Sequence, residues 1–386
     1  MSEHRHPVLL RRDSRVSTIE LFFDLVYVFA ITQLARTLVD HLTVLGAVQT
    51  AVLLAMVWQV WVYTTWTSNY LDTSRDSFRV MLLLLMLASL VLSGGLTEAF
   101  GARGLLVASA YLAMQVGRGT FMIVALRGTP LRRTFLRIVP WTAATSVLVL
   151  VGATLDPGWR LGLWAAAIAI DHVSSAAGFP VPGLGRSTTR EWTIDGSHFA
   201  ERCQAFVLIA LGEAVVVVGG RMAVVDAASA AQMAAFGVAF ATSVGLWWVY
   251  FDRAAEDSAR VIASSTDPGR LARDAFHWIH PLIVGGIIVA SAADEVLLGG
   301  PTARGSATVG WLTLGGVALF LAGHAAFKAV VWRLVSWPRV VGAALCLALV
   351  PVAPHVSVLS LAVVALAVVV AVAVADRTVG RRAAAS

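Results

Sequence analysis

Two apolar segments of the chain carry ionisable side chains at the spacing of an α-helix. The first contains Glu20 and Asp24 in the run I-E-L-F-F-D-L-V; they are four positions apart, so both carboxylates project from one helix face. The second opens with H-F-A-E-R, in which His198, Glu201 and Arg202 bring a base, an acid and a cation onto one turn. Such groups can form ion pairs, relay protons or bind a polar solute.

Other ionisable residues lie deeper in apolar segments. Glu213 stands in the run L-G-E-A, where local solvation is poor, and an apolar setting favours the protonated form of a carboxyl group. It is therefore a candidate for taking up and releasing a proton. The remaining candidates are Arg118 and Asp171 and, as a secondary pair four positions apart on one face, His324 and Lys328.

The composition indicates that these segments lie in a membrane. Of the 386 residues, 58% are hydrophobic and 13% charged, whereas soluble proteins have roughly 45–50% apolar and about 25% charged residues. So few charges cannot cover the apolar surface in water, and a bilayer removes that need. The net charge of +6 is spread over the segments between apolar runs, which favours a role in membrane orientation and argues against a nucleic-acid partner.

Hydropathy predicts an all-α polytopic membrane helix bundle with about twelve transmembrane helices. The first apolar run follows a basic segment, as in a secretory signal, but it contains two acids and exceeds the roughly 7–15 apolar residues of a signal. We therefore expect it to be retained as the first span. The predicted spans are 19–39, 44–66, 78–97, 105–126, 136–153, 159–176, 199–219, 228–251, 275–294, 308–330, 339–353 and 356–375.

The basic residues orient these spans. If the N-terminus is cytoplasmic, the predicted cytoplasmic segments hold 21 basic residues and the outward loops hold four. Cytoplasmic loops of membrane proteins carry an excess of Lys and Arg, so this distribution places both termini inside.

The chain is expected to consist of two six-helix halves. The predicted organisation is a cytoplasmic N-terminal tail (1–18), a first half (19–176), a cytoplasmic linker (177–198), a second half (199–375) and a cytoplasmic C-terminal tail (376–386). Trp61-Val62-Tyr63 and Trp248-Val249-Tyr250 end the second span of each half. Because six is even, a duplication would give parallel repeats related by an axis along the membrane normal. Chance similarity between helices rich in Ala, Val and Leu is the alternative.

Two interpretations of the intramembrane charges stay open. An ionisable group at the bilayer centre costs at least about 2.5–3.5 kcal/mol, so each one needs a function or a partner. The cytoplasmic half of the bundle is expected to hold four acids and three cations: Glu20, Asp24, Asp171, Glu201, Arg118, Arg202 and Lys328. This near-balance fits a structural network of ion pairs, and it fits a cavity open to the cytoplasm equally well.

No motif indicates a metal, a cofactor or a catalytic residue. His277 and His280 have the spacing of metal ligands on a helix, but no third ligand is indicated and Pro281 follows at once. Paired glycines lack the strand and loop context of a nucleotide site. Cys203 and Cys346 lie in apolar runs and are expected to be buried thiols.

The motifs resemble those of one bacterial family. I-E-L-F-F-D-L-V-Y-V-F-A-I at 19–31, H-F-A-E-R-C at 198–203 and I-A-L-G-E-A at 209–214 are similar to segments of the low-temperature-requirement A (LtrA) proteins, and the resemblance covers most of the chain. The chain has Tyr27 where Phe is usual and Ala214 where Ser is usual, which removes a hydroxyl beside the carboxylate of the third motif. The resemblance implies a multi-pass protein of the bacterial cytoplasmic (inner) membrane. It implies no substrate, cofactor or reaction.

Three classes of function compete. A transporter-like or permeation protein with an unknown small-molecule or ion substrate is favoured, because many spans, a repeat and intramembrane carboxylates are typical of secondary transporters. A scaffold or membrane-adaptation protein with structural ion pairs is the alternative. A lipid enzyme is least favoured, because it needs a nucleophile or metal constellation that the sequence does not show. The lipid bilayer is the expected partner, and a homo-oligomer is compatible with the sequence.

The topology can be tested by cysteine labelling. We expect Arg304→Cys, in a predicted outward loop, to react with a membrane-impermeant maleimide added outside, and Arg333→Cys, in a predicted cytoplasmic segment, to react only after the membrane is opened. Labelling of position 304 from the cytoplasm alone would contradict the predicted orientation.

Overall fold

The computed structural model of the protein describes residues 15–192, 194–223, 229–251, 258, 260–262 and 264–383, and these form helices and loops. Their main helices are α1 (Thr18–Asp40), α2 (Val44–Tyr70), α3 (Asp76–Gly94), α4 (Gly104–Ala125), α5 (Leu131–Ala153), α6 (Pro157–Ala176), α7 (Gly196–Ala223), α8 (Ala230–Phe251), α10 (Pro268–Ala272), α11 (His280–Gly299), α12 (Ala307–Trp332), α13 (Trp337–Leu349) and α14 (Val358–Ala383). Among these residues, β pairing is limited to two isolated bridges. The predicted all-α polytopic membrane bundle is confirmed.

Ten helical segments of the described chain are long and apolar enough to cross a membrane. Helices α4 and α6 are not among the ten; they carry Arg118 and Asp171 within their apolar runs. Each of the twelve predicted spans coincides with a helical segment, but the count of twelve crossings stays a prediction. Most of the predicted N-terminal tail lies outside the described residues.

The ninth predicted span, 275–294, is too short. A continuous helical segment runs from Pro268 to Gly299, through α10, a π-helical stretch and α11. Asp294 and Glu295 lower the hydropathy at the end of the predicted span. The helix nevertheless continues past them, because Asp294 is buried against other helices rather than exposed at a helix end.

Helix ends follow local sequence signals. Ser306 precedes α12 and its hydroxyl accepts the backbone N–H of Val309 at 3.2 Å, which satisfies one of the unpaired donors of the first turn. Proline stands in the first turn of α6, α11 and α13, where the missing N–H costs nothing. Arg333 ends α12 in the left-handed conformation at φ 56°.

The chain divides into two compact units. Unit 1 comprises Met1–Leu34, Val48–Ala205 and Ile262–Arg273, and unit 2 comprises Ala35–Ala47, Phe206–Val261 and Asp274–Ser386. Helices α1 and α7 therefore contribute residues to both units. Two units of this size are compatible with the predicted halves, whose boundary at the 177–198 linker stays a prediction.

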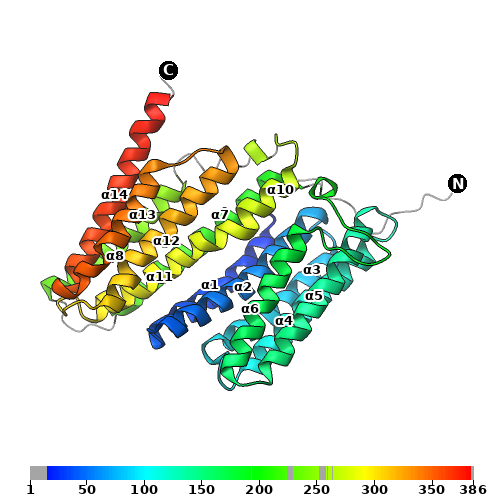
Figure 1. The fold of residues 1–386 in the computed structure, drawn as a ribbon, viewed down its shortest axis with the longest axis horizontal. Coiled ribbons are helices and arrows are strands. Elements are labelled where there is room, and N and C mark those ends of the chain that lie inside the picture. The colour runs from blue at the N-terminus through cyan, green and yellow to red at the C-terminus, as the bar shows by residue number, and fades with distance from the viewer. Residues whose placement is uncertain are drawn as a thin grey trace. The chain divides into compact units, whose positions relative to one another are not determined.

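In unit 1, consecutive helices pack side by side. Helices α3 to α6 form a series in which each contacts the next, and Figure 1 shows them in cyan to green. Gly119 of α4 lies against the side chain of Val139 in α5, so the two helices approach closely. The buried indole of Trp164 in α6 donates to the backbone oxygen of Val149 in α5 at 2.8 Å.

In unit 2, glycines allow the closest packing. Helix α11 packs along α12, and α8 packs along α14, as Figure 1 shows. A Cβ atom on Gly286 of α11 would lie only 2.5 Å from the backbone nitrogen of Phe320 in α12. Gly316 and Gly323 of α12 are similarly close to α11. Small residues at such contacts let helix backbones approach in a membrane.

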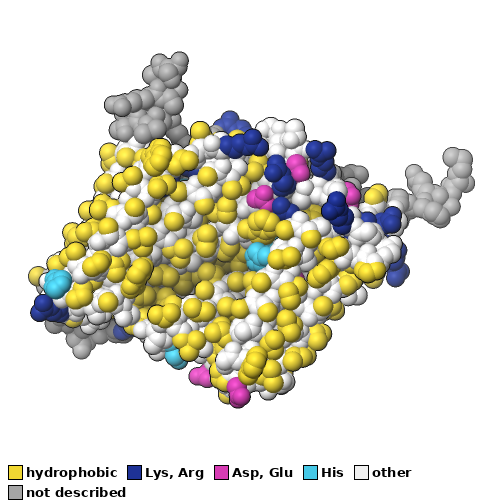
Figure 2. Space-filling model, in the orientation of Figure 1, with side chains coloured by type: hydrophobic (Ala, Val, Ile, Leu, Met, Phe, Trp, Pro, Cys, Tyr) yellow, Lys and Arg dark blue, Asp and Glu magenta, His cyan; other side chains and the backbone are white. Residues whose placement is uncertain are grey.

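The outer surface is suited to lipid. Figure 2 shows hydrophobic side chains over most of the visible face and most of the visible Lys and Arg side chains near helix ends. Large apolar side chains such as Phe22, Leu84 and Leu87 are exposed along the helices. A soluble protein rarely exposes apolar surface on this scale, whereas a bilayer requires it.

The α11–α12 contact makes a specific prediction about stability. We expect Gly286→Ala to lower the thermal unfolding temperature of the purified protein in detergent, because the added methyl group meets backbone atoms that must shift. Gly237→Ala on α8 is the matched control, since nothing lies within 4 Å of its added Cβ. Equal unfolding temperatures for the two variants would contradict the close packing.

Candidate functional site

A buried ion-pair network joins α1 and α7 within unit 1. The Arg202 guanidinium donates through Nε to Oδ2 of Asp24 at 2.8 Å and through Nη2 to Oδ1 of the same carboxylate. Its Nη1 lies 3.3 Å from Oε1 of Glu20. All three side chains are 0% exposed. The two-pronged contact is the geometry in which arginine binds carboxylates most strongly.

His198 extends this network by one turn of α7. The backbone N–H of Asp195 donates to Oδ1 of Asn69 at 2.8 Å, so the Asn69 Nδ2 group is the donor toward Nδ1 of His198 at 3.1 Å. With Nδ1 accepting, the ring proton lies on Nε2, which is 2.9 Å from Oε1 of Glu20. The imidazole therefore donates to the carboxylate of Glu20.

Neighbouring elements satisfy the remaining oxygens. The Trp61 indole of α2 donates to Oδ1 of Asp24 at 2.7 Å. The backbone N–H and hydroxyl of Ser17 both donate to Oε2 of Glu20, at 2.8 and 2.7 Å. Two carboxylates share one guanidinium here, and many donors surround them. This arrangement stabilises the carboxylates without water and fixes the position of α1 against α7.

The two motifs singled out in the sequence meet in this network through Glu20, Asp24, His198 and Arg202, whereas Glu201 takes no part in it. Glu201 is exposed, and its Oε2 accepts the backbone N–H of Val16 at 3.2 Å. Adjacent positions on an α-helix are separated by about 100°, so a residue next to Arg202 points well away from the face that Arg202 occupies.

A second polar cluster in unit 1 surrounds Arg118 of α4. Its guanidinium donates to the backbone oxygen of Val60 at 3.2 Å, to the hydroxyl of Thr64 at 3.4 Å and to Oε1 of Gln115, and it lies 5.2 Å from the centre of the Tyr63 ring. All of these partners are neutral. Within the described part of the chain, Arg118 has no carboxylate within 4 Å.

Asp171 of α6 belongs to the surroundings of Arg118. It is buried, accepts the Thr145 hydroxyl at 3.0 Å and interacts electrostatically with Arg118 without a direct salt bridge. Asp171 therefore moderates the charge of Arg118 from a distance. The charges of unit 1 that were predicted for the cytoplasmic half thus form two groups. One is the ion-pair network between α1 and α7, and the other is Arg118 with Asp171, which interact without a direct salt bridge.

Glu213 of α7 lies in unit 2 and faces α11. It is 1% exposed, and the hydroxyl of Ser291 donates to its Oε2 at 3.0 Å. Asp294 stands three positions after Ser291, on the same face of α11, and its charge interacts with that of Glu213. Asp294 is 7% exposed and forms no salt bridge with any residue that the structure describes. Asp294 therefore lies close enough to Glu213, inside unit 2, for the two carboxyl groups to interact electrostatically.

His324 is held by an arginine rather than by Lys328. The Arg339 Nε of α13 donates to Nδ1 of His324 at 3.1 Å, and Nη1 of the same guanidinium forms a 2.6 Å salt bridge with Asp376 of α14. His324 also stacks on the Tyr250 ring, with 5.6 Å between centroids. Lys328 is half-buried and one turn further along α12. This cluster ties α8, α12, α13 and α14 together.

No group of three or more His, Cys, Asp or Glu side chains in the described part of the chain is placed to hold a metal ion. His280 instead lies 3.3 Å from the hydroxyl of Tyr250. Cys203 and Cys346 are buried free thiols, as predicted.

Three contributors to these clusters were missed by sequence reasoning. Asp294 is the last residue of a predicted span, although apolar residues follow it and its neighbour Glu295. Arg339 lies at the start of a predicted span, and Asp376 begins the predicted C-terminal tail. Their burial against each other depends on the packing of α13 and α14, which a hydropathy pattern does not show.

Comparison with known proteins agrees with the motifs of these clusters. The family described as "Bacterial low temperature requirement A protein (LtrA)" matches residues 15–375. The chain belongs to the LtrA family. An uncharacterized protein of Rhizobium meliloti (strain 1021) is 34% identical over 359 residues, which cover 91% of this chain and 87% of that relative. No solved structure matches the present chain.

The LtrA match contains both halves of the ion-pair network. The region 15–375 includes the α1 motif with Glu20 and Asp24, the α7 motif with His198 and Arg202, and the Glu213 segment. These are the motifs on which the resemblance rests. The network is thus built from segments that lie within the family match.

Breaking the network should destabilise this LtrA protein. We expect Asp24→Asn to lower the free energy of unfolding by about 3–5 kcal/mol, because it leaves a buried Arg202 without its charged partner. Thermal unfolding in detergent, followed by tryptophan fluorescence, measures the effect. Glu201→Gln is the matched control on the same helix, because this carboxylate is exposed. A wild-type unfolding temperature for Asp24→Asn would show that the pair contributes little.

Proposed function

We propose that this LtrA-family protein is a secondary transporter in which the carboxyl pair of Glu213 and Asp294 binds and releases a proton. The observation that supports the proposal is the electrostatic interaction between these two buried acids of α7 and α11, inside unit 2, beside the hydrogen bond from Ser291 to Glu213. The solute that moves with the proton is a small molecule or an ion.

The depth of Glu213 supports a role in transport. Glu213 is about 25 Å along α7 from Gly196 and about 15 Å from Ala223, so it lies far from both ends of the helix. Asp294 is about 21 Å along α11 from His280 and about 8 Å from Gly299, so it lies nearer to one end of its helix. An acid at the depth of Glu213 is costly in a bilayer, and in transporters such acids mark the paths of ions and protons.

The chemistry of the pair suits reversible proton binding. In a medium of low polarity, a nearby carboxylate disfavours ionisation of its neighbour, so the pair is suited to hold one proton and to release it. The Ser291 hydroxyl donates to Glu213 and stabilises an ionised oxygen there. A rearrangement that brings a cation or water to the pair would release the proton, which can couple proton movement to solute movement.

The proposed location is the bacterial cytoplasmic membrane with both termini inside. The distribution of basic residues supports this orientation, because 21 of them fall in the segments that would be cytoplasmic and four fall in the outward loops. A proton gradient across that membrane would supply the driving force.

A second candidate function is a scaffold or membrane-adaptation protein. The network of Glu20, Asp24, His198 and Arg202 favours it, because every one of these side chains is 0% exposed and hydrogen-bonded within the protein. Such a network can exist for stability alone. In that case the protein would mediate no solute flux at all.

Substitution of Glu213 separates the two functions. Glu213→Gln imitates the protonated form with little change in volume. If the protein is a transporter, the variant should keep its fold, but its rate of uptake driven by a pH gradient should fall at least about tenfold. Uptake into proteoliposomes is measured with a panel of labelled solutes and an imposed pH difference, with Glu201→Gln as the matched control on α7.

Infrared spectroscopy provides a readout that needs no substrate. A pH step should produce a change in the C=O stretching band of a protonated carboxyl group, and this change should disappear in Glu213→Gln and in Asp294→Asn. Wild-type flux and an unchanged band in Glu213→Gln would contradict the proposal, and Asp24 or Asp171 would become the next candidate. No flux with any solute would favour the scaffold.

A further inference from the structure

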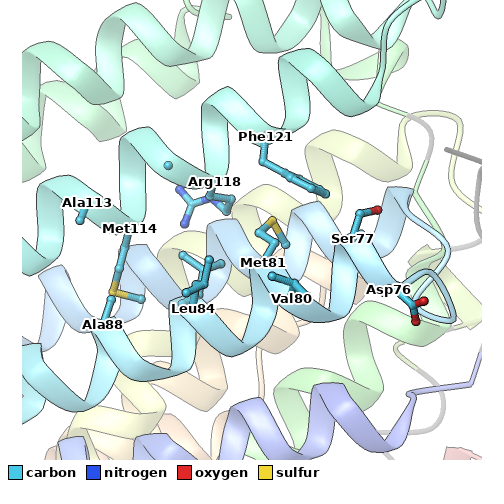
Figure 3. A pocket seen from close by; sticks show the side chains of 12 residues that line it. Asp76, Ser77, Val80, Met81, Leu84, Ala88, Ala113, Met114, Arg118 and Phe121 are labelled. Carbon is cyan, nitrogen blue, oxygen red and sulfur yellow. The ribbon is translucent and has the colours of Figure 1, made fainter. Parts of the chain in front are cut away.

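Helices α3 and α4 of unit 1 enclose a groove that the clusters above leave unexplained. Its volume is about 590 Å³, within the range of about 300–1,000 Å³ that is typical of small-molecule sites. The walls are mainly apolar side chains from both helices, among them Met81, Leu84, Met114 and Phe121. Figure 3 shows these side chains with Arg118 in the space between the two helices.

The groove has the length of a hydrocarbon chain and opens to the outer surface. It follows α3 from Asp76 to Ala88, which is about 18 Å of helix. This is close to the thickness of one leaflet, since the hydrocarbon core of a bilayer measures about 30 Å. Leu84 lines the groove and is 62% exposed, so an apolar molecule can enter sideways from the lipid-facing surface.

Arg118 gives the groove one positive charge. Its side chain lines the groove and is only 4% exposed. The hydrogen bonds it makes are to neutral groups, the backbone oxygen of Val60, Thr64 and Gln115. A buried cation without a close counter-ion is costly, and an anion bound beside it would lower that cost.

The surroundings favour an anion of single charge. Asp171 interacts electrostatically with Arg118 and offsets part of its positive charge. At one end of the groove the exposed Asp76 forms a salt bridge with Arg79 at 4.0 Å, so it adds little net charge there. The planar guanidinium matches the two oxygens of a carboxylate.

We propose that the α3–α4 groove binds a hydrophobic monocarboxylate, with the carboxylate on Arg118 and the apolar body along Met81, Leu84 and Met114. Two sources supply this chemistry. A fatty acid would enter from the bilayer, and a small arylalkanoic acid would enter from water. The site is in unit 1, and its occupation does not depend on the proton cycle proposed for Glu213 and Asp294.

Two variants test the site by different means. Arg118→Gln removes the charge. Gly117→Leu fills the groove, and it should leave the fold intact because nothing lies within 4 Å of the added Cβ. Gly162→Leu is the matched control, since this α6 glycine is also exposed and open, but it does not line the groove.

The probe is radiolabelled dodecanoate, bound at equilibrium by the full-length protein in nanodiscs of zwitterionic lipid. We expect saturable binding that is weakened about tenfold to a hundredfold by Arg118→Gln, as for loss of a hydrogen bond to a charged group. Gly117→Leu should weaken binding at least tenfold, whereas Gly162→Leu should bind as wild type does. Methyl dodecanoate, which has no charge, should compete poorly.

Competition with phenylacetate identifies the source. If dodecanoate binds and phenylacetate does not displace it, the result supports a ligand that comes from the bilayer. If phenylacetate displaces dodecanoate, the result supports a ligand that enters from water. Three results would overturn the proposal: no saturable binding of either acid to wild type, wild-type affinity in a folded Gly117→Leu protein, or equal competition by the methyl ester. Each can occur with the proton cycle intact, so the two proposals fail separately.

Discussion

Arg202 binds two carboxylates of α1 from its place on α7, and water has no access to any of the three side chains. A charged group in such an environment cannot replace its protein partner with water. Loss of one partner therefore leaves the other charge buried and uncompensated, which costs free energy of folding. The first turns of α1 and α7 are therefore fixed together, and Trp61 and Asn69 of α2 are drawn to the same place by their hydrogen bonds. Three helices of unit 1 are thus held together at this contact.

Three of the buried arginines, Arg118, Arg202 and Arg339, differ in what surrounds them. Arg202 and Arg339 each have a carboxylate in direct contact, Asp24 and Asp376 respectively, and both tie helices together. Arg118 has neutral partners and an apolar groove beside it. The same residue type therefore has a structural role in two places and a proposed binding role in the third. The difference lies in whether the protein itself supplies the negative charge.

The acids show a parallel division. Glu20 and Asp24 are surrounded by donors, which suits a permanent structural role. Glu213 and Asp294 interact electrostatically between α7 and α11, and the Ser291 hydroxyl donates to Glu213. A carboxyl group near a second carboxyl group binds a proton more readily, whereas a nearby arginine favours the ionised form of a carboxyl group. This contrast is the reason for assigning proton binding to unit 2 rather than to the α1–α7 network.

Composition and periodicity were sufficient to predict the membrane helices, because hydrocarbon requires long apolar segments whatever their neighbours are. The pairing of the α1 and α7 motifs could also be predicted, since charges that enter the same apolar region have few other partners. The exposure of Glu201 could not be predicted. Neighbouring residues on a helix are about 100° apart, so Glu201 and Arg202 cannot both face the buried side, and the sequence does not show which of them does.

Other features depended on tertiary structure alone. Asp294 and Arg339 looked like residues at helix ends, and only the packing of α11 against α7, and of α13 against α14, shows that they are buried and what they contact. The groove beside Arg118 is likewise a product of packing, because its lining comes from both α3 and α4. Which segments are long and apolar enough for a membrane follows from the sequence alone, because transfer into lipid is a property of each segment. Which charges are in contact follows only from the packing, because contact depends on the rotation and neighbours of every helix.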